Sequence, residues 1–186
     1  MKKFFNAIYP IDEEILDEYL SYYDRVSYKR KDFITKAGDV ERFLYFVEEG
    51  IQRSFCIKED KEHVMAFTYP PSVTGVPESF FTQQPSRYYL ECLTDSTLIR
   101  ISYSDHQKML QKHRPLETLF RKSTEILLAG ILDRHYELLA LTIEERFRAF
   151  TKRSPHLLNM VPHKHIASYL RIDPSNFSKL LGSINI

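Results

Sequence analysis

Polar and basic side chains follow a helix-start signal near the C-terminal end, within residues 163–181. Asp173 can accept a hydrogen bond from a free backbone amide, and Pro174 suits the first position of a helix. The polar residues that follow are Ser175, Asn176, Ser178 and Lys179. Such side chains reach base edges and phosphates when the N-terminus of a helix lies in a major groove. The segment therefore predicts contact with double-stranded DNA.

Two short helices joined by a tight turn are predicted to position these side chains. The apolar or small residues that would pack them together are Ile166, Ala167, Leu170, Ile172, Phe177, Leu180 and Leu181. Within each helix, spacings of three and four place these side chains on one face. The small side chain of Ala167 allows the two helices to cross closely. The alternative is a helical hairpin with no role in DNA binding.

The charge of the chain is distributed unevenly. The net charge is +1, but residues 141–186 hold seven basic and three acidic residues, which gives this segment +4. The remainder holds 19 basic and 22 acidic residues and carries −3. A basic C-terminal module on a slightly acidic body fits phosphate contact at one end.

Composition argues against a membrane protein. The chain is 43% hydrophobic and 27% charged, as is typical of a soluble protein with a buried core. No apolar run is long enough to span a bilayer, and the first residues become acidic too early for a signal peptide. We therefore expect a cytoplasmic protein without membrane contact.

Motifs for catalysis or metal binding are missing from the sequence. It has no Gly-rich phosphate loop, no GxSxG and no HExxH, so we expect no enzyme and no catalytic residues. Cys56 and Cys92 form no CxxC pair and are predicted to be buried thiols. The His residues predicted to be solvated are His106, His113, His135 and His156. We therefore expect neither a metal site nor a cofactor.

Hydrophobic alternation with a period of two predicts strands between about residues 25 and 102. The predicted strands are Val26–Arg30, Phe33–Thr35, Phe43–Glu48, Ile51–Ile57, His63–Tyr69, Tyr88–Leu93 and Thr97–Ser102. Turn signals such as Glu49-Gly50 separate them. A helix over 11–22 precedes the strands and another over 103–112 follows them. Short, evenly spaced strands predict a sandwich or a rolled barrel.

A long helix is predicted from Pro115 to about residue 139. Small residues at Ser123 and Gly130 lie on one seam and favour a coiled-coil contact between two copies. The alternative is a helix packed on its own barrel. Thr142 and Glu145 form a capping-box pattern that starts a further helix, Ile143–Arg153. The break between the two helices predicts a hinge near residues 139–142.

This order of elements resembles the Crp/Fnr family of transcription regulators over nearly the whole chain, especially its compact Bacteroidetes-type members. The segments that carry the resemblance are 37–39, 43–50, 86–91, 142–146, 152–155 and 161–181. It implies an α+β fold, with an N-terminal antiparallel β-roll (a double-stranded β-helix) and flanking helices in 1–114. A dimerisation helix (115–140) and a helix-turn-helix domain (141–186) would follow. The implied protein is a homodimer whose recognition helices enter successive major grooves.

The resemblance also implies roles for single residues near DNA. Those that would read bases or touch phosphates are Ser175, Asn176 and Lys179, with His163, Lys164 and His165 at the start of the first helix. Arg171 stands where the family usually has Gly in the turn, so a strained backbone is expected there at a cost of about 1 kcal/mol. Pro174 replaces the family's usual Arg, so a different target sequence is expected.

An effector pocket is implied in the β-roll. Cyclic-nucleotide binders of this family use a Glu for the ribose hydroxyl and an Arg for the cyclic phosphate. The corresponding region here holds Gly75, Val76, Glu78, Ser86 and Arg87, with Tyr89 as a further lining residue. Val76 replaces the Glu and Ser86 replaces the Arg, while Arg87 lies one position later, on the other face of a strand. Binding of cyclic AMP in the usual way is therefore not expected; the roll would take a different small molecule or none.

These patterns predict a homodimeric, DNA-binding transcription regulator with a β-roll sensor domain. The alternative is a module that binds a cyclic nucleotide or another small ligand and uses its C-terminal helices for protein contacts.

Overall fold

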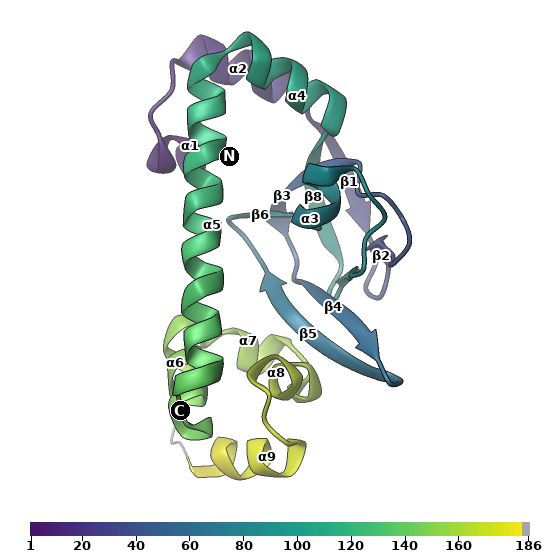
Figure 1. Ribbon diagram of the computed structural model, residues 1–186, viewed down its shortest axis with the longest axis vertical. Coiled ribbons are helices and arrows are strands. Elements are labelled where there is room, and N and C mark those ends of the chain that lie inside the picture. Colours follow the sequence, from purple (N-terminus) through teal and green to yellow (C-terminus); the bar gives the residue numbers. More distant parts are fainter. Residues whose placement is uncertain (184–186) are drawn as a thin grey trace. The chain divides into compact units, whose positions relative to one another are not determined.

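The computed structural model describes residues 1–183 and divides the chain into two compact units. The first unit contains Met1–Cys56 and Ala66–Ile126, and the second contains Ile57–Met65 and the chain from Leu127 onward. The long helix α5 (Arg114–Ala140) contributes to both units (Figure 1). It agrees closely with the long helix predicted from Pro115.

Two four-stranded antiparallel sheets form the β-roll. One has the strand order β1-β8-β3-β6, and the other has the order β2-β7-β4-β5. The strands are β1 (Asp24–Tyr28), β2 (Phe33–Thr35), β3 (Phe43–Glu49), β4 (Gln52–Lys58), β5 (Lys61–Thr68), β6 (Ser72–Thr74), β7 (Tyr89–Cys92) and β8 (Ser96–Ser102). The predicted strands and the α+β class are confirmed. The three-residue strand β6 was not predicted, because it follows the turn signal Pro70-Pro71 directly.

Strands β3 and β8 of the first sheet bury apolar side chains together. Tyr45, Val47 and Leu98 are buried, and Val47 lies opposite Leu98 in the pairing of β3 with β8. Gly50, in the turn before β4, has a φ of +93°, and a Cβ there would lie 2.2 Å from the Ser96 Oγ. The predicted Glu49-Gly50 turn therefore needs glycine for both its conformation and its close contact.

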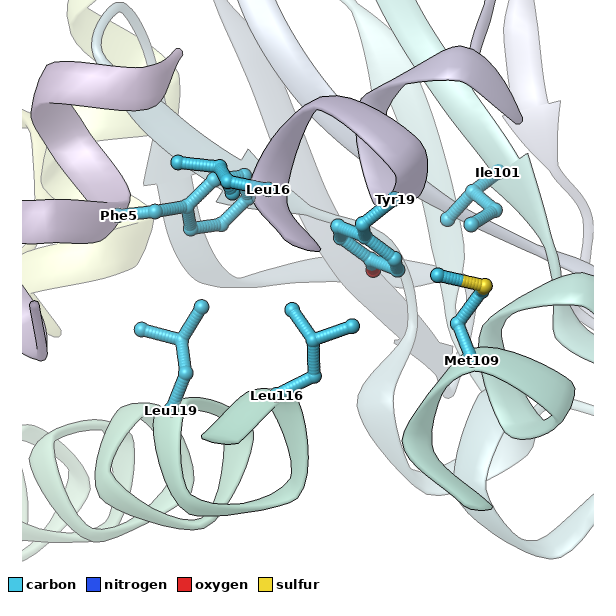
Figure 2. Close-up of a cluster of buried hydrophobic side chains, with 7 residues drawn as sticks. All are labelled: Phe5, Leu16, Tyr19, Ile101, Met109, Leu116 and Leu119. Atoms are coloured by element: carbon cyan, nitrogen blue, oxygen red, sulfur yellow. The ribbon is translucent and has the colours of Figure 1, made fainter. Parts of the chain in front are cut away.

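Helices cover one end of the roll. They are α1 (Lys2–Ile8), α2 (Glu13–Ser21), α4 (Tyr103–Lys112) and the first turns of α5. Figure 2 shows the buried cluster that joins them to β8; its members are Phe5, Leu16, Tyr19, Ile101, Met109, Leu116 and Leu119. Helix α1 was not predicted because its sequence, KKFFNAI, is too short to show a helical period.

His106 corrects a prediction, because it is buried rather than solvated. Its Nδ1 lies 2.8 Å from the Tyr19 hydroxyl, which in turn accepts a hydrogen bond from Tyr23 at 2.9 Å. The imidazole also meets the ring of Phe120 edge to face, at 4.5 Å between centroids. Burial in this aromatic surrounding lowers the pKa of His106 to about 4.

This burial should make stability depend on pH. Below pH 6.5 the unfolded chain takes up a proton at His106, whereas the folded chain stays neutral down to about pH 4. The native protein should therefore lose about 3 kcal/mol of unfolding free energy between pH 7 and pH 4 relative to a His106→Gln variant. Urea unfolding of both proteins across this range measures the difference, and a constant difference would contradict a neutral, buried imidazole.

Candidate functional site

The second unit contains α6 (Ile143–Arg153), α7 (Leu157–Met160), α8 (His163–Leu170) and α9 (Pro174–Ser183) beside the end of α5. Its described core consists of buried apolar side chains from several of these helices: Phe147, Phe150, Leu157, Leu158, Ile166, Ala167, Leu170, Ile172 and Phe177. The rings of Phe147 and Phe177 meet edge to face at 5.4 Å. The two short helices predicted within 163–181 are therefore present and packed on a shared core.

The turn between α8 and α9 has the geometry that the sequence predicted. Arg171 adopts the left-handed conformation, with φ 53° and ψ 47°. Its N–H donates to Ser168 O at 3.1 Å, and the N–H of Ile172 donates to Ala167 O at 2.9 Å. This pair of bonds is a Schellman motif, in which glycine is the usual residue at the position of Arg171.

Asp173 caps the start of α9, as predicted. Its Oδ1 accepts hydrogen bonds from the hydroxyl of Ser175 at 2.6 Å and from its backbone N–H at 2.8 Å. These bonds, led by the one from the hydroxyl, hold the pKa of Asp173 below its ordinary value. The Ser175 hydroxyl donates its proton to Asp173, so it can accept a hydrogen bond from a base but has no proton left to donate to a phosphate oxygen.

The first turns of α9 present the predicted DNA-binding side chains to solvent. Ser175, Asn176, Ser178 and Lys179 are all exposed. The Ser178 hydroxyl donates to Pro174 O at 3.0 Å, within the helix. The amide of Asn176 and the ammonium of Lys179 are therefore the side chains on this surface best suited to contact an external partner.

The three predicted DNA contacts at the start of α8 differ in their exposure to solvent. His163 and Lys164 are exposed, but the Nε2 of His163 lies 3.2 Å from Leu158 O and its ring lies 5.5 Å from that of Phe177. His165 is buried, with its Nδ1 3.9 Å from a carboxylate oxygen of Glu62. Of the three, Lys164 therefore remains the one suited to touch phosphate.

The tip of the β4–β5 hairpin belongs to the same unit and binds α8. The Ser168 hydroxyl donates to Glu62 O and accepts from Val64 N–H, both at 3.1 Å. These two backbone groups lie on β5, an edge strand of its sheet. Ser168 therefore satisfies part of an open sheet edge.

In the first unit, the predicted pocket residues lie in helix α3 (Pro77–Thr82) and on either side of it. Val76 is buried, and Glu78 accepts two hydrogen bonds of 3.1 Å from the guanidinium of Arg87. Those bonds hold the pKa of Glu78 below its ordinary value, although the Arg87 side chain is 76% exposed. The structure thus pairs these two charges with each other.

Ser86 and Tyr89, two further predicted pocket residues, bond to or pack against neighbouring protein groups. The Ser86 hydroxyl is engaged by the backbone of Tyr88, donating to its O at 2.8 Å and accepting from its N–H at 2.9 Å. Tyr89 stacks on Phe55, with 5.0 Å between ring centroids. Gly75 precedes α3 with a φ of +149°.

Glu41 is a buried residue near this segment that the sequence did not reveal. Its carboxylate accepts hydrogen bonds from the hydroxyl of Thr35 and from Phe43 N–H. Its backbone N–H donates to the Ser79 hydroxyl at 2.9 Å, and its C=O accepts from Gln83 at 3.1 Å. Burial raises its pKa above the ordinary value. The run Asp39–Arg42 holds two acids and an arginine, and nothing in this pattern singles out Glu41 for such a role.

Comparison with known proteins identifies the domain that holds this segment. Residues 25–113 match the family model of the cyclic nucleotide-binding domain. The chain carries a cyclic nucleotide-binding domain. The match includes Glu41, α3 and the Glu78–Arg87 pair, so the effector residues predicted from the sequence lie inside this domain. No curated protein matches the chain.

Solved structures of Crp/Fnr-type regulators share the fold of the chain beyond this domain. FixK2 from Bradyrhizobium japonicum has a TM-score of 0.74 at 19% identity, covering 87% of this chain and 83% of its own. The catabolite activator protein of Thermus thermophilus has a TM-score of 0.60 at 21% identity, covering 95% of this chain and 84% of its own. The c-di-GMP-responsive regulator CLP of Xanthomonas campestris has a TM-score of 0.68 at 18% identity, covering 92% of this chain and 91% of its own. At these identities the likeness establishes the fold.

Within residues 1–183, no helix has both the length and the apolar character needed to cross a membrane. The same described residues contain no group of three or more His, Cys, Asp or Glu side chains arranged to hold a metal ion.

The conformation of Arg171 leads to a stability prediction. A side chain with a Cβ is strained in the left-handed region, so Arg171→Gly should raise the unfolding free energy by about 0.5–1 kcal/mol, and Arg171→Val should lower it. Urea unfolding followed by circular dichroism measures both changes. If the glycine variant is less stable than the native chain, the strain at this turn is not the dominant effect.

Proposed function

We propose that this protein is a cytoplasmic, homodimeric transcription regulator that binds double-stranded DNA and carries a β-roll sensor domain. The observation that carries the proposal is the exposed surface of the first two turns of α9. It presents Asn176 and Lys179 on a helix whose Phe177 is buried in the core. The likeness to Crp/Fnr-type regulators supports it, since that family consists of regulators rather than enzymes.

The chemistry of α9 suits recognition in the major groove. An Asn side chain can form two hydrogen bonds with adenine, and a Lys side chain can contact guanine or a phosphate. Helix α9 would act as the recognition helix and α8 as the helix that positions it. The excess of basic residues after residue 140 supplies the non-specific attraction to the DNA backbone.

The middle of α5 supplies the dimer contact in this proposal. Several large apolar side chains there are exposed in one chain: Ile126, Leu127, Leu128, Ile131 and Leu132, with exposed fractions of 43–59%. Apolar surface of this extent on one helix marks a protein contact, and a second copy of α5 would cover it in a coiled coil. Residues 1–114 would then form the sensor, 115–140 the dimer helix and 141–186 the DNA-binding domain.

The sensor is proposed not to bind cyclic AMP in the usual way. A cyclic phosphate needs a fixed cation and amide donors. The guanidinium of Arg87 is paired with Glu78, and the position where the family's phosphate-binding Arg is expected holds Ser86, which is bonded to the backbone of Tyr88. The roll therefore senses a different small molecule or acts without one.

Salt-dependent DNA binding tests the proposal. With random duplex DNA, the logarithm of the association constant should fall linearly with the logarithm of the salt concentration, because phosphate contacts release counterions. Lys179→Ala should reduce this slope by about 1, whereas Lys3→Ala, at an exposed position of α1, should leave it unchanged. Fluorescence anisotropy at several salt concentrations gives these slopes.

Two outcomes of the titration would contradict the proposal. If the native protein does not bind DNA even at low salt, the regulator assignment fails and the ligand-binding module with protein-contacting helices is favoured. If Lys3→Ala changes the slope as much as Lys179→Ala does, DNA binding does not depend on α9.

A ligand titration tests the sensor. Thermal unfolding with millimolar cyclic AMP or cyclic GMP should show no rise in the melting temperature, because a ligand stabilises the folded state only when it binds that state. A rise that saturates with concentration would contradict the expected loss of cyclic-nucleotide binding.

A further inference from the structure

The junction between α5 and α6 is held by long side chains. Helix α5 ends at Ala140 and α6 begins at Ile143, after a cap in which Thr142 and Glu145 bond to each other as predicted. The guanidinium of Arg146 donates through Nη1 to Leu141 O at 2.8 Å and through Nε to Leu170 O at 3.1 Å. One side chain therefore joins the junction to the end of α8.

A second arginine joins α5 directly to the end of α8. Arg134 donates through Nη2 to Tyr169 O and lies over the ring of Tyr169, with 4.1 Å from Cζ to the centroid. Its Nη1 donates to Glu137 at 2.9 Å. Carbonyls at the C-terminal end of a helix lack partners within the helix and attract cations, so both arginines bind where α8 favours positive charge.

Glu137 of α5 accepts hydrogen bonds from α6, across the junction. Its two oxygens accept hydrogen bonds from Arg153 at 2.7 and 3.4 Å. Burial disfavours ionisation of Glu137, but the bonds from Arg153 and Arg134 outweigh it and keep its pKa below the ordinary value. The side chains of Glu137 and Arg134 are only 12% and 15% exposed, so water screens this pair little.

We propose that Arg134, Glu137 and Arg146 are positioning residues that lock the α5–α6 junction. The C-terminal part of α5 and the helix pair α8–α9 then move as one body, and residues 139–142 do not act as a hinge. The division of the chain into units agrees with this lock, because the end of α5 from Leu127 onward groups with α6–α9.

The lock has a consequence for target choice that rests on the proposed function. In a dimer joined through α5, a rigid junction sets the separation of the two α9 helices. The protein should then bind only inverted half-sites of one spacing, whereas a loose junction would accept several spacings.

Hydrogen exchange of the full-length chain tests the lock without DNA. Arg146→Lys keeps the charge but cannot bond both carbonyls with its single amine. Amides of residues 141–146 and 168–172 should exchange at least tenfold faster in this variant than in the native chain. The control is Arg148→Lys, at an exposed i,i+4 pair with Glu144 on α6, which should change the same amides less than twofold. Equal effects of the two variants would overturn the lock.

Spacing selectivity tests the positioning role. Duplexes selected by the native protein from random DNA are lengthened or shortened by one and two base pairs between the half-sites. A change of one base pair in this spacing should lower the DNA affinity of the native protein more than tenfold. It should lower that of an Arg134→Lys/Arg146→Lys double variant less than threefold. A double variant with faster exchange and unchanged spacing selectivity would overturn the inference. If the native protein selects no DNA, the proposed function fails and the exchange experiment alone decides on the lock.

Discussion

The placement of the α8–α9 pair depends on how the last four carbonyls of α8 are satisfied. All four accept hydrogen bonds, two from the turn that follows α8 and two from side chains of α5 and α6. Ala167 O and Ser168 O accept from the turn residues Ile172 and Arg171, which sets the direction in which α9 leaves. Tyr169 O and Leu170 O accept from Arg134 and Arg146, which come from α5 and α6. The end of one eight-residue helix thus couples the exposed polar surface of α9 to the long helix.

Local signals allowed most of this unit to be predicted from the sequence. Caps are determined by residues a few positions apart, so the Asp173 cap and the Thr142–Glu145 box could be expected. The left-handed Arg171 was expected only from the resemblance to a family that usually has Gly at this position. The strands of the roll were predictable because alternation is also local. Helix α3 was not predicted, because it is only six residues long and shows no helical period, although Pro77 is a start signal.

Interactions between distant residues were not predictable. Arg146 bonds a carbonyl 24 positions away and Arg134 one 35 positions away, and in the sequence both look like ordinary charged positions on a helix surface. The same applies to the burial of His106, whose hydroxyl partner is 87 positions away on α2, and of Glu41. Charged and polar residues acquire such roles from tertiary packing, which neither composition nor periodicity reports.

The central claim is that two copies of α9 read two half-sites held apart by α5. Sequencing of genomic DNA fragments enriched by the purified protein tests it most directly. The account predicts a shared motif with two inverted half-sites whose centres lie about one helical turn apart. Enriched fragments without a shared motif, or with a single half-site lacking dyad symmetry, would contradict it.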